Sequence, residues 1–374
     1  MRFPEFSGEW KCTTIGNIGD IKNGPFGSVL HAEDYVENGI PIVTTEHFKT
    51  GLMPSDKFGI PQVSNEDYIR LKGYRLETND IVFSRVGSVD INAHVGIEQN
   101  GWLFSGRVLR VRPKYDIDSL FLHYALSTEA VKRDIRNRAV GQTMPSINTP
   151  ILSSTTIQLP KDLFEQKKVA HFLRLLDERI ITQNKIIEKL QSLIKGLRVC
   201  CMQRVYGNNV YLSEIAQIYQ PQTISSTELT EDGFLVYGAN GIIGKYKDYN
   251  HETEQICITC RGNTCGMVNY TKPMSWITGN AMVINTDKYQ DKVYKKYLYH
   301  YLSAYNFNSI ISGSGQPQIV RTPLEKLKIT LPTISEQKQK AMILDKIQDK
   351  IDINHNVLNL YILQKQYLLR QMFI

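Results

Sequence analysis

The chain has 374 residues, and its 44 Lys and Arg residues against 37 Asp and Glu residues give a formal charge of +7. This length predicts two or three domains, and a content of 42% hydrophobic and 22% charged residues excludes a disordered or collagen-like protein. No stretch approaches about 18 uninterrupted apolar residues and the first residues lack the apolar segment of a signal peptide, so we expect a cytoplasmic protein without a membrane span. Six cysteines, two of them adjacent at Cys200 and Cys201, predict free thiols rather than a secreted disulfide framework.

The first 160 residues predict a domain of mixed α and β structure. Short runs rich in β-branched and aromatic residues, such as 81–83, alternate with turns that contain Gly, Asn and Pro. We expect a helix over 118–136. Just after Leu159-Pro160, Asp162 and Glu165 form the pattern of an N-terminal capping box. This pattern predicts that a long helix begins there and occupies 161–206.

The second half of the chain repeats this plan. It has a mixed segment over 207–332, with a helix expected over 291–311, and then a second long helix over 333–374 that begins at the capping-box pattern of Thr333 and Glu336. Short strings also recur in the same order about half a chain apart, which is the signature of an internal repeat. These pairs are Gly141-Gln142 with Gly315-Gln316, Thr149-Pro150 with Thr322-Pro323, Leu159-Pro160 with Leu331-Pro332, and Glu165-Gln166-Lys167 with Glu336-Gln337-Lys338.

Both long helices carry a coiled-coil seam, because apolar residues follow one another at alternating spacings of four and three. One amide interrupts each seam at the equivalent position, Gln183 and Asn354. Such an amide either fixes the register of the helix pair or lies at an exposed end of the contact. Because each helix follows its own globular segment, the second helix buries its seam most simply by returning antiparallel along the first. The expected fold class is α+β: two similar mixed α/β domains separated by two long helices in an antiparallel coiled coil, related by a pseudo-twofold axis.

Catalytic and metal-binding motifs are incomplete. Glu165 with Lys167, and their counterparts in the second half, match half of a metal nuclease site but lie at helix starts rather than on a strand. The run 238–246 departs from the spacing of a phosphate-binding loop, and no methyltransferase motif is present. Cys257, Cys260 and Cys265 with nearby His251 approach zinc-ligand spacing, but strand alternation would separate Cys257 from Cys260, so we expect buried thiols. We expect no catalytic residue, no metal and no cofactor bound by this chain.

Side chains suited to DNA recur in both halves. Positive charge is concentrated near the first long helix, where 151–210 hold 10 basic and 5 acidic residues. Basic clusters over 107–112, 132–138 and 292–296 are either phosphate contacts or solvated faces. Direct readout uses Arg for guanine and Asn or Gln for adenine, although such residues also serve turns. The candidate DNA-binding residues are Arg85, Ser88, Arg107, Arg110 and Gln142 in the first half, and Tyr237, Asn240, Arg261, Asn263, Gln316 and Gln318 in the second.

These features resemble the specificity (S) subunits of type I restriction-modification systems. The resemblance covers essentially the full chain. It is most specific in two features: the paired Leu-Pro and Glu-Gln-Lys strings at the helix starts, and Trp10-Lys11 followed by Gly24-Pro25-Phe26-Gly27-Ser28. Further support comes from Gly39-Ile40-Pro41 and from the run 237–244. It implies two target recognition domains, each reading one half of a bipartite, asymmetric DNA site, and a helix pair that sets the unread spacer.

The resemblance also implies partners. These are double-stranded DNA, two methyltransferase (M) subunits docked mainly on the helices, and motor-nuclease (R) subunits in the full complex. S-adenosylmethionine is then expected on the M subunits, and ATP and Mg²⁺ on the partner subunits, while the S subunit itself is non-catalytic. The competing interpretation is an interaction scaffold, with two protein-binding modules on a coiled-coil rod and no DNA. Near-neutral globular segments favour it slightly, but the basic helices and the whole-chain resemblance favour DNA.

Overall fold

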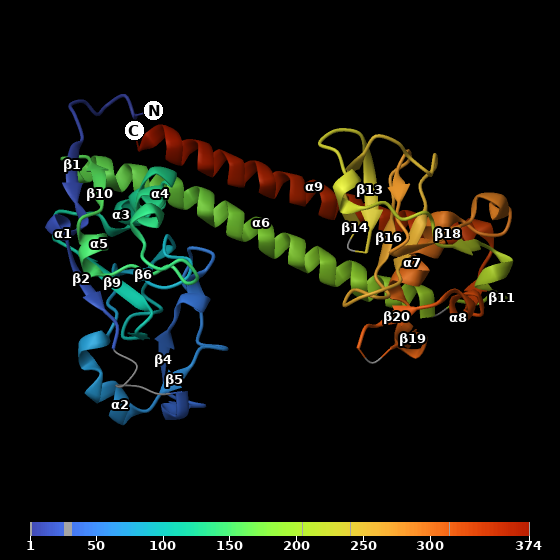
Figure 1. Cartoon of the computed structure of the whole chain (residues 1–374), viewed down its shortest axis with the longest axis horizontal. Helices are drawn as coiled ribbons and strands as arrows, with labels where there is room; N and C mark the ends of the chain where they lie inside the picture. The colour runs from blue at the N-terminus through green and yellow to red at the C-terminus, as the bar shows by residue number, and fades with distance from the viewer. Residues whose placement is uncertain (1, 26–31, 204, 240, 314, 374) are drawn as a thin grey trace. The chain divides into compact units, whose positions relative to one another are not determined.

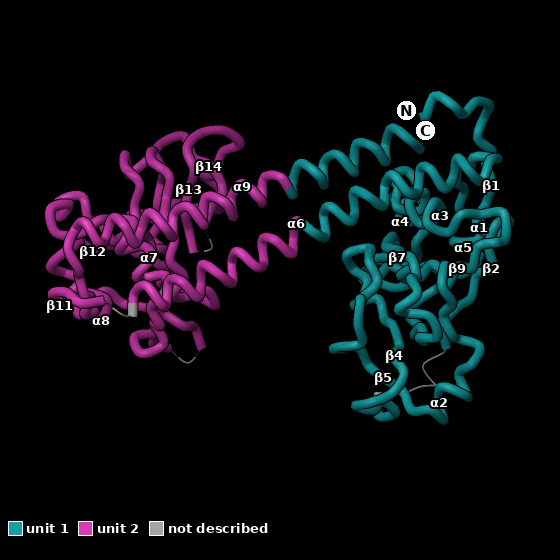
Figure 2. Tube along the Cα trace, turned by 180° about the vertical axis from the view of Figure 1, so that it is seen from behind, with its two compact units in different colours: residues 1–182, 358–374 teal, residues 183–357 magenta. Residues whose placement is uncertain are grey.

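The computed structural model describes residues 2–25, 32–203, 205–239, 241–313 and 315–373. It divides the chain into two compact units (Figure 2): unit 1 contains 1–182 with 358–374, and unit 2 contains 183–357. Each unit combines a mixed α/β domain with parts of two long helices, α6 (Leu163–Gln203) and α9 (Ile334–Met372) (Figure 1).

Unit 1 is built on a four-stranded sheet in the order β2-β9-β6-β7, beside a second sheet in the order β3-β5-β4-β8 and the antiparallel pair β1-β10. Its strands are β1 (Lys11–Thr14), β2 (Gly19–Asn23), β3 (Tyr35–Val36), β4 (Ile40–Val43), β5 (Gln62–Val63), β6 (Ile81–Ser84), β7 (Asn92–His94), β8 (Leu103–Phe104), β9 (Val108–Pro113) and β10 (Thr156–Leu159). Its shorter helices are α1 (Ile15–Ile18), α2 (Asn65–Arg70), α3 (Ser119–Leu126), α4 (Glu129–Arg138) and α5 (Thr149–Ser153).

Unit 2 repeats this plan. The sheet β12-β18-β15-β16 corresponds to β2-β9-β6-β7, and the antiparallel pair β11-β21 corresponds to β1-β10. In the second sheet, β13 pairs in parallel with β17 as β4 pairs with β8. The strands are β11 (Asn208–Tyr211), β12 (Gln217–Tyr219), β13 (Phe234–Gly238), β14 (Gly241–Tyr246), β15 (Ile256–Thr259), β16 (Val268–Tyr270), β17 (Trp276–Ile277), β18 (Ala281–Asn285), β19 (Ile311–Ser312), β20 (Gln318–Ile319) and β21 (Lys328–Leu331), with helices α7 (Lys295–Ala304) and α8 (Arg321–Glu325). Two similar mixed α/β domains and two long helices confirm the predicted fold class.

The central strand of each main sheet is buried on both faces. In β6, Ile81 and Phe83 pack into the core that contains α3 and the start of α6, whereas Val82 packs into a second core with Phe104. Strand alternation produces this division, because successive side chains point to opposite faces. The equivalent strand β15 places Cys257 where β6 has Val82. Its thiol is fully buried, and burial raises its pKa to about 12.

The Gln of each repeated Glu-Gln-Lys string joins the long helix to its domain. Gln166 is 1% exposed, accepts a hydrogen bond from Asp118 N at 2.9 Å and donates to Pro160 O at 3.0 Å. Gln337, also 1% exposed, accepts from Tyr294 N at 2.8 Å and donates to Pro332 O at 2.9 Å. A buried amide that satisfies two backbone groups costs free energy to replace, which accounts for its place in both copies.

The capping-box prediction is confirmed for the second long helix and only half correct for the first. Thr333 and Glu336 bond reciprocally at the start of α9. At the start of α6, Asp162 caps Phe164 N at 2.8 Å, but Glu165 is buried and accepts hydrogen bonds from Arg2 and Trp10 instead. An N-terminal arm, which has no counterpart before the second domain, therefore takes the carboxylate that the capping box would use.

The two helices expected beside the long ones are shorter than predicted. The helix over 118–136 is divided into α3 and α4, because the hydroxyl of Ser127 donates to His123 O and that of Thr128 to Ala125 O, both at 2.8 Å. These bonds satisfy carbonyls that the next helical turn would use. The helix over 291–311 ends at Ala304. There the Asn306 side chain caps a separate 3₁₀ helix, Phe307–Ser309.

The long helices pack antiparallel within each unit. In unit 1, Asp177 of α6 pairs with Lys365 of α9 and Arg179 lies over the ring of Tyr361. In unit 2, Arg198 donates to Gln348, and Lys340 donates to Cys201 O at 2.9 Å. Position numbers fall along α9 as they rise along α6, as antiparallel helices require. The predicted seam is confirmed, since its apolar residues are buried or half-buried, among them Val169, Leu173, Leu176, Ile187, Ile194, Leu344, Ile351, Leu368 and Met372.

The two seam amides meet directly in unit 2. Gln183 is 8% exposed, and its Nε2 donates to Asn354 Oδ1 at 2.5 Å and to Asn354 O at 3.2 Å. Replacing only one of them by Leu should lower the free energy of unfolding by about 1 to 3 kcal/mol, because the other amide loses its partner in an apolar seam. Replacing both by Leu should restore the free energy of unfolding, but the two long helices should then be held less strictly in one register. Denaturation midpoints of the single and double variants form the cycle that measures this coupling, and additivity within about 0.5 kcal/mol would contradict it.

Each unit contains a buried histidine, and that of unit 2 joins its domain to the long helices. In unit 2, His300 is fully buried, accepts at Nδ1 from Arg198 Nε at 3.1 Å and lies 3.0 Å from Asp345 Oδ1 through Nε2. Burial is the largest cause that lowers the pKa of His300, and Arg198 lowers it further, while Asp345 opposes them. In unit 1, burial holds the pKa of His123 well below its usual value, and its Nδ1 lies 2.7 Å from Asn92 Oδ1.

These pKa shifts predict acid destabilisation. A histidine with a lowered pKa is neutral in the folded chain but binds a proton in the unfolded chain below about pH 6.5. Its stabilising contribution is therefore complete above that pH and decreases as the pH falls. Between pH 7 and 5, His300→Gln should flatten the pH dependence of the unfolding free energy by up to about 1.4 kcal/mol per pH unit. The matched variant His355→Gln, at an exposed histidine, should leave the slope unchanged; an equal slope in all three proteins would contradict the prediction.

Candidate nucleic-acid interface

Two loops of unit 1 are held side by side by backbone hydrogen bonds. Gly87 N donates to Pro145 O at 2.8 Å, and Ile147 N donates to Arg85 O at 2.9 Å. Residues 140–146 form a narrow hairpin in which Val140 and Ser146 exchange hydrogen bonds of 2.9 and 2.8 Å. The structure therefore brings Ser88 and Gln142, which are 54 residues apart in the sequence, into one cluster of loops.

Arg107 belongs to the same cluster. It immediately precedes β9, and its carbonyl accepts a hydrogen bond from Arg85 N at 3.0 Å. The guanidinium of Arg85 donates to Gly106 O at 3.2 Å, and no described residue accepts from its other donors, which can therefore serve a ligand. Ser88, Arg107 and Gln142 are exposed, and within the described part of the chain their side chains have no hydrogen-bond or ionic partner. We call residues 85–88, 105–107 and 140–146 the unit 1 loop cluster.

Unit 2 contains the equivalent arrangement. Gly262 N donates to Pro317 O and Ile319 N to Cys260 O, both at 3.0 Å, and Arg261 forms a β-bridge with Gln318. The side chains of Arg261, Asn263, Gln316 and Gln318 are exposed, and no described residue is bonded to them. Residues 261–263 and 316–318 are the unit 2 loop cluster. The structure thus brings together four candidates within each unit, Arg85, Ser88, Arg107 and Gln142 in unit 1 and Arg261, Asn263, Gln316 and Gln318 in unit 2.

Arg110 is placed differently from these candidates. It is 5% exposed, lies on β9 and pairs with Asp20 of the neighbouring strand β2. A guanidinium that is almost fully buried and paired with a carboxylate is poorly placed to reach a DNA base. We therefore leave Arg110 out of the proposed interface.

Of the two remaining candidates of unit 2, Tyr237 is buried and Asn240 is not described. Tyr237 is 5% exposed, its ring packs with Cys257 and Val283, and its hydroxyl accepts a hydrogen bond from Lys272 N at 3.1 Å. Burial raises the pKa of this hydroxyl. Asn240 lies outside the described residues. The aromatic position thus serves the core of unit 2.

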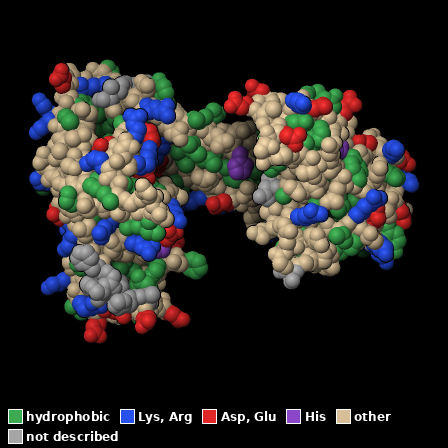
Figure 3. Space-filling view, in the orientation of Figure 1, with side chains coloured by type: hydrophobic (Ala, Val, Ile, Leu, Met, Phe, Trp, Pro, Cys, Tyr) green, Lys and Arg blue, Asp and Glu red, His purple; other side chains and the backbone are tan. Residues whose placement is uncertain are grey.

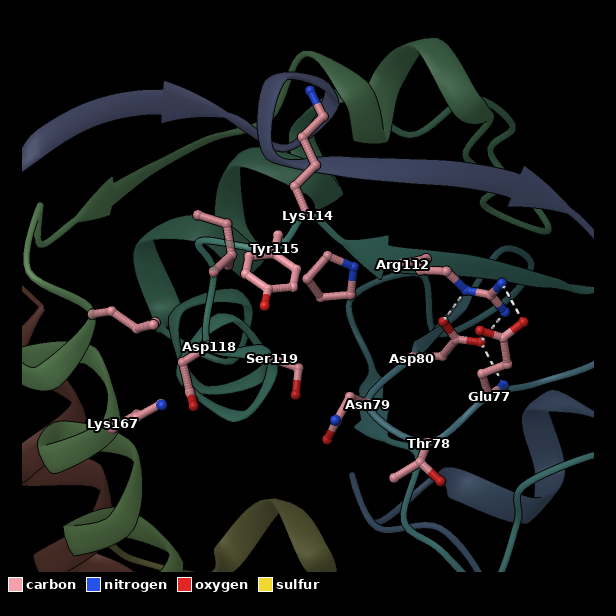
Figure 4. A pocket seen from close by; sticks show the side chains of 13 residues that line it. Glu77, Thr78, Asn79, Asp80, Arg112, Lys114, Tyr115, Asp118, Ser119 and Lys167 are labelled. Atoms are coloured by element: carbon pink, nitrogen blue, oxygen red, sulfur yellow. Dashed lines mark hydrogen bonds and ion pairs between the residues drawn. The ribbon is translucent and has the colours of Figure 1, made fainter.

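Most members of the basic clusters are already paired with carboxylates. Arg112 lies on one side of a pocket of about 440 Å³ and bonds to Asp80 at 2.8 Å and to Glu77 at 2.6 Å (Figure 4). The other paired members are Arg136 with Asp90 and Glu129, Arg138 with Asp134, Lys295 with Asp287, and Lys296 with Asp345. These clusters are therefore largely structural.

The thiols and carboxylates do not form a metal site in the described ranges. Among those residues no group of three or more His, Cys, Asp or Glu side chains is arranged to hold a metal ion. Cys257 and Cys260 belong to different cores, as strand alternation predicts, and all six cysteines are free. In the part of the chain that is described, no helix is long and apolar enough to span a membrane.

Sequence reasoning missed Glu46 and Asn280. Glu46 lines a groove with Arg85 and Arg107. In unit 1, Ser105 N donates to Val43 O at 2.9 Å, and in unit 2, Thr278 N donates to Tyr237 O at 3.0 Å. These equivalent bonds align Val43 with Tyr237 and Ser105 with Thr278. Counted along the sequence from these pairs, Glu46 corresponds to Asn240 and Arg107 to Asn280. The internal repeat could have identified Glu46, because Glu46 is the counterpart of the candidate Asn240. This correspondence was not apparent, because the spacing of the motifs differs between the two halves.

Comparisons with known proteins identify the family of this chain. The family described as type I restriction modification DNA specificity domain matches residues 7–192 and 208–360. The chain is 26% identical to the type I restriction enzyme MjaVIII specificity subunit of Methanocaldococcus jannaschii, over 94% of this chain and 88% of that protein. It is 32% identical to the type I restriction enzyme EcoprrI specificity subunit of Escherichia coli, but that match covers only 38% of this chain and 36% of that protein.

Solved structures share the fold. The crystal structure of a type I restriction-modification S subunit from M. genitalium matches with a TM-score of 0.67 and 17% identity, over 100% of this chain and 99% of that chain. A chain from a structural study of the assembly and conformational transition of a type I system matches with a TM-score of 0.58 and 14% identity, over 99% and 98%. The resemblance drawn from the sequence is confirmed, and the chain belongs to the type I restriction-modification DNA specificity family.

Proposed function

We propose that this chain is the DNA-specificity subunit of a cytoplasmic type I restriction-modification complex and that each unit reads one half of a bipartite site. The observation that carries this proposal is the loop cluster built twice from equivalent backbone hydrogen bonds. Each copy presents exposed Arg, Asn or Gln side chains without partners among the described residues. Base edges in the major groove are read by these side-chain types, and two readers in one chain suit an asymmetric site.

The proposed contacts come from both clusters. Arg85, Ser88, Arg107 and Gln142 act in unit 1, and Arg261, Asn263, Gln316 and Gln318 act in unit 2. Their guanidiniums suit guanine, and their amides suit adenine. Exposed basic residues that no described carboxylate pairs with, such as Arg133 and Lys292, are suited to phosphate contacts, which position the protein without reading sequence.

The long helices offer surface for protein partners. Apolar side chains lie exposed on them (Figure 3), including Leu360 at 65% and Leu363 at 60% in unit 1, and Ile353 at 61% and Met342 at 57% in unit 2. Exposed apolar patches rimmed by polar residues mark protein-binding sites. In this proposal the two methyltransferase subunits dock on these helices, and motor-nuclease subunits join the full complex.

The proposal gives this chain no reaction of its own. Its contribution is to select and hold the DNA site, while the methyltransferase subunits carry S-adenosylmethionine and the motor-nuclease subunits use ATP with Mg²⁺. Removing these cofactors should therefore abolish methylation or cleavage but leave sequence-selective DNA binding in place.

The helix pair sets the unread spacer in this proposal. Inserting four residues into α6 and four into α9 at equivalent seam positions adds about 6 Å of helical rise. The spacer should then lengthen by roughly 1 to 2 base pairs, at about 3.4 Å for each pair. Methylome sequencing of cells that carry the variant measures the spacer. An active complex with an unchanged spacer would eliminate this role for the helices.

A selection experiment tests the function directly. The full chain, purified with its methyltransferase subunits, is mixed with duplex DNA containing a randomised segment, and bound DNA is sequenced. We expect a motif with two fixed halves around an unread spacer. Arg261→Ala should weaken the base preference at one position of one half-site by about 1 to 3 kcal/mol. Arg321→Ala removes an exposed arginine paired with Glu325 in the same unit, and it should leave the base preferences unchanged. A bound pool without any motif would refute the proposed function.

A further inference from the structure

A groove of about 450 Å³ in unit 1 lies where two sheets meet. Its lining includes Arg85 and Arg107 from the unit 1 loop cluster, and Thr44, Thr45 and Glu46 from the turn after β4. Tyr35 and Ser105 also line it, so the groove combines two guanidiniums with one carboxylate and four hydroxyls. This set contains both strong donors and an acceptor that cannot donate when ionised.

Strand pairing fixes the two arginines on one side of the groove. Arg85 follows β6 and Arg107 precedes β9, and these antiparallel strands pair Ser84 with Val108. A tight backbone crossing supports the floor. A Cβ at Gly24 would lie 1.9 Å from Ser105 O, and a Cβ at Gly106 would lie 2.3 Å from Pro25 O, so only glycine fits at either position. The positions of the two guanidinium stems therefore follow from the packed sheet.

A short 3₁₀ helix, Thr45–Phe48, holds Glu46 on the other side. Thr44 N donates to His47 Nδ1 at 3.0 Å, and burial lowers the pKa of His47, which keeps this nitrogen free to accept. Phe48 is fully buried and anchors the end of the turn. Glu46 itself is exposed, with Lys49 of the same turn as its ionic partner. An exposed pair of this kind is weak, so the carboxylate remains available to a ligand.

We propose that this groove reads a G·C base pair in the half-site of unit 1, with Arg107 donating to guanine and Glu46 accepting from cytosine. The inference rests on the proposed function and adds the identity of one base pair to it. Guanine offers O6 and N7 as acceptors in the major groove, and cytosine offers its N4 amino group as a donor. The groove presents the complementary set, and Arg85 reinforces the guanine side. A groove for phosphate alone would not include an ionised carboxylate.

The second unit lacks both charged groups. By the repeat, Arg107 corresponds to Asn280 and Glu46 to Asn240, so amides stand in the sequence where unit 1 has a cation and an anion. Two halves of one chain with different side chains at equivalent positions will prefer different bases. The effect of changing Glu46 or Arg107 should therefore be confined to one half of the site.

The experiment compares variants of the full chain, purified with its methyltransferase subunits, in selection from randomised duplex DNA. Glu46→Ala and Arg107→Ala should each reduce the preference for G·C by about tenfold or more, and both at the same base-pair position in the same half. The other half and the spacer should stay as in the unaltered chain. The controls are Glu66→Ala and Arg70→Ala, which remove an exposed carboxylate and an exposed guanidinium of unit 1 outside the groove and should retain the original motif.

The outcomes separate this proposal from the function on which it rests. If the unaltered chain selects a bipartite motif but the two groove variants keep every preference, the proposal of a G·C-reading groove is wrong and the proposed function stands. Relaxation at an A·T pair, at two different positions or in both halves also overturns it. If the unaltered chain selects no motif, both proposals fail together. Unfolding midpoints within about 1 °C of the unaltered chain, as expected for exposed positions, show that folding is not the cause.

Discussion

Replacing residues 1–150 by the matching segment of another family member should change one half of the recognised DNA site completely and leave the other half and the spacer unchanged. All residues of the unit 1 loop cluster lie within this segment, whereas the unit 2 loop cluster lies within 261–318. Each cluster is built from residues of its own unit, so each should retain its own preference. Methylome sequencing of cells that carry the hybrid measures both halves at once.

A second hybrid controls for folding. The exchange at residue 150 leaves β10 in place, while its partner β1 comes from the donor protein. This pairing consists of backbone hydrogen bonds, which tolerate changes of side chain, but the flanking core is sensitive to volume. A hybrid exchanged over 1–160 carries both strands together and should show the same half-site change. If either active hybrid alters both halves together, the two units do not read independently.

The long helices and the repeat could be predicted because their signals are local. A seam of alternating four and three spacings determines which helix face is buried, whatever the rest of the fold does. Val169, Leu173 and Leu344 are accordingly buried as expected. The contact of Gln183 with Asn354 also follows from equal seam positions in an antiparallel pair.

The roles of individual polar residues depended on tertiary contacts that no local pattern contains. Glu165 fits a capping box, but Arg2, more than 160 residues earlier, binds it. Gln166 follows Glu165 in the repeated string. Its structural role is evident only from its hydrogen bonds with Asp118 N and Pro160 O. Arg110 matched the composition of a DNA contact, yet the buried face of β9 commits it to Asp20.

The groove residue Glu46 shows a different limit. Composition and spacing favoured amides and arginines in glycine-rich turns, and a lone glutamate after a short strand carries no such signal. Its position became informative only when the parallel pairing of β4 with β8 placed it in the same groove as Arg107. Parallel strands are joined through long connections, so their neighbours are distant in the sequence. Sites of this kind require the topology before the side chains can be interpreted.

The largest effect on stability is expected from Asp177→Ala in unit 1. The carboxylate of Asp177 is 13% exposed and joins three helices: it accepts from Tyr124 of α3 at 2.7 Å and pairs with Lys365 of α9. Tyr124 is 1% exposed, and burial raises the pKa of its hydroxyl, which the nearby carboxylate raises further. Removing Asp177 strands a buried hydroxyl and a partly buried ammonium group. The free energy of unfolding should fall by about 3 kcal/mol.

Two further variants distinguish loss of the pair from loss of volume. Asp134→Ala removes an aspartate that is 47% exposed and pairs with Arg138 on the surface of α4, so it should cost about 0.5 kcal/mol or less. The double variant Asp177→Leu with Lys365→Met removes both charges and fills the space, and it should recover much of the loss, because apolar side chains replace a buried ion pair well. Chemical denaturation of all three gives the comparison. If Asp177→Ala loses no more stability than Asp134→Ala, this carboxylate does not secure the domain of unit 1 to its helices, and the junction must depend on the apolar contacts of Leu173, Leu176 and Leu368 instead.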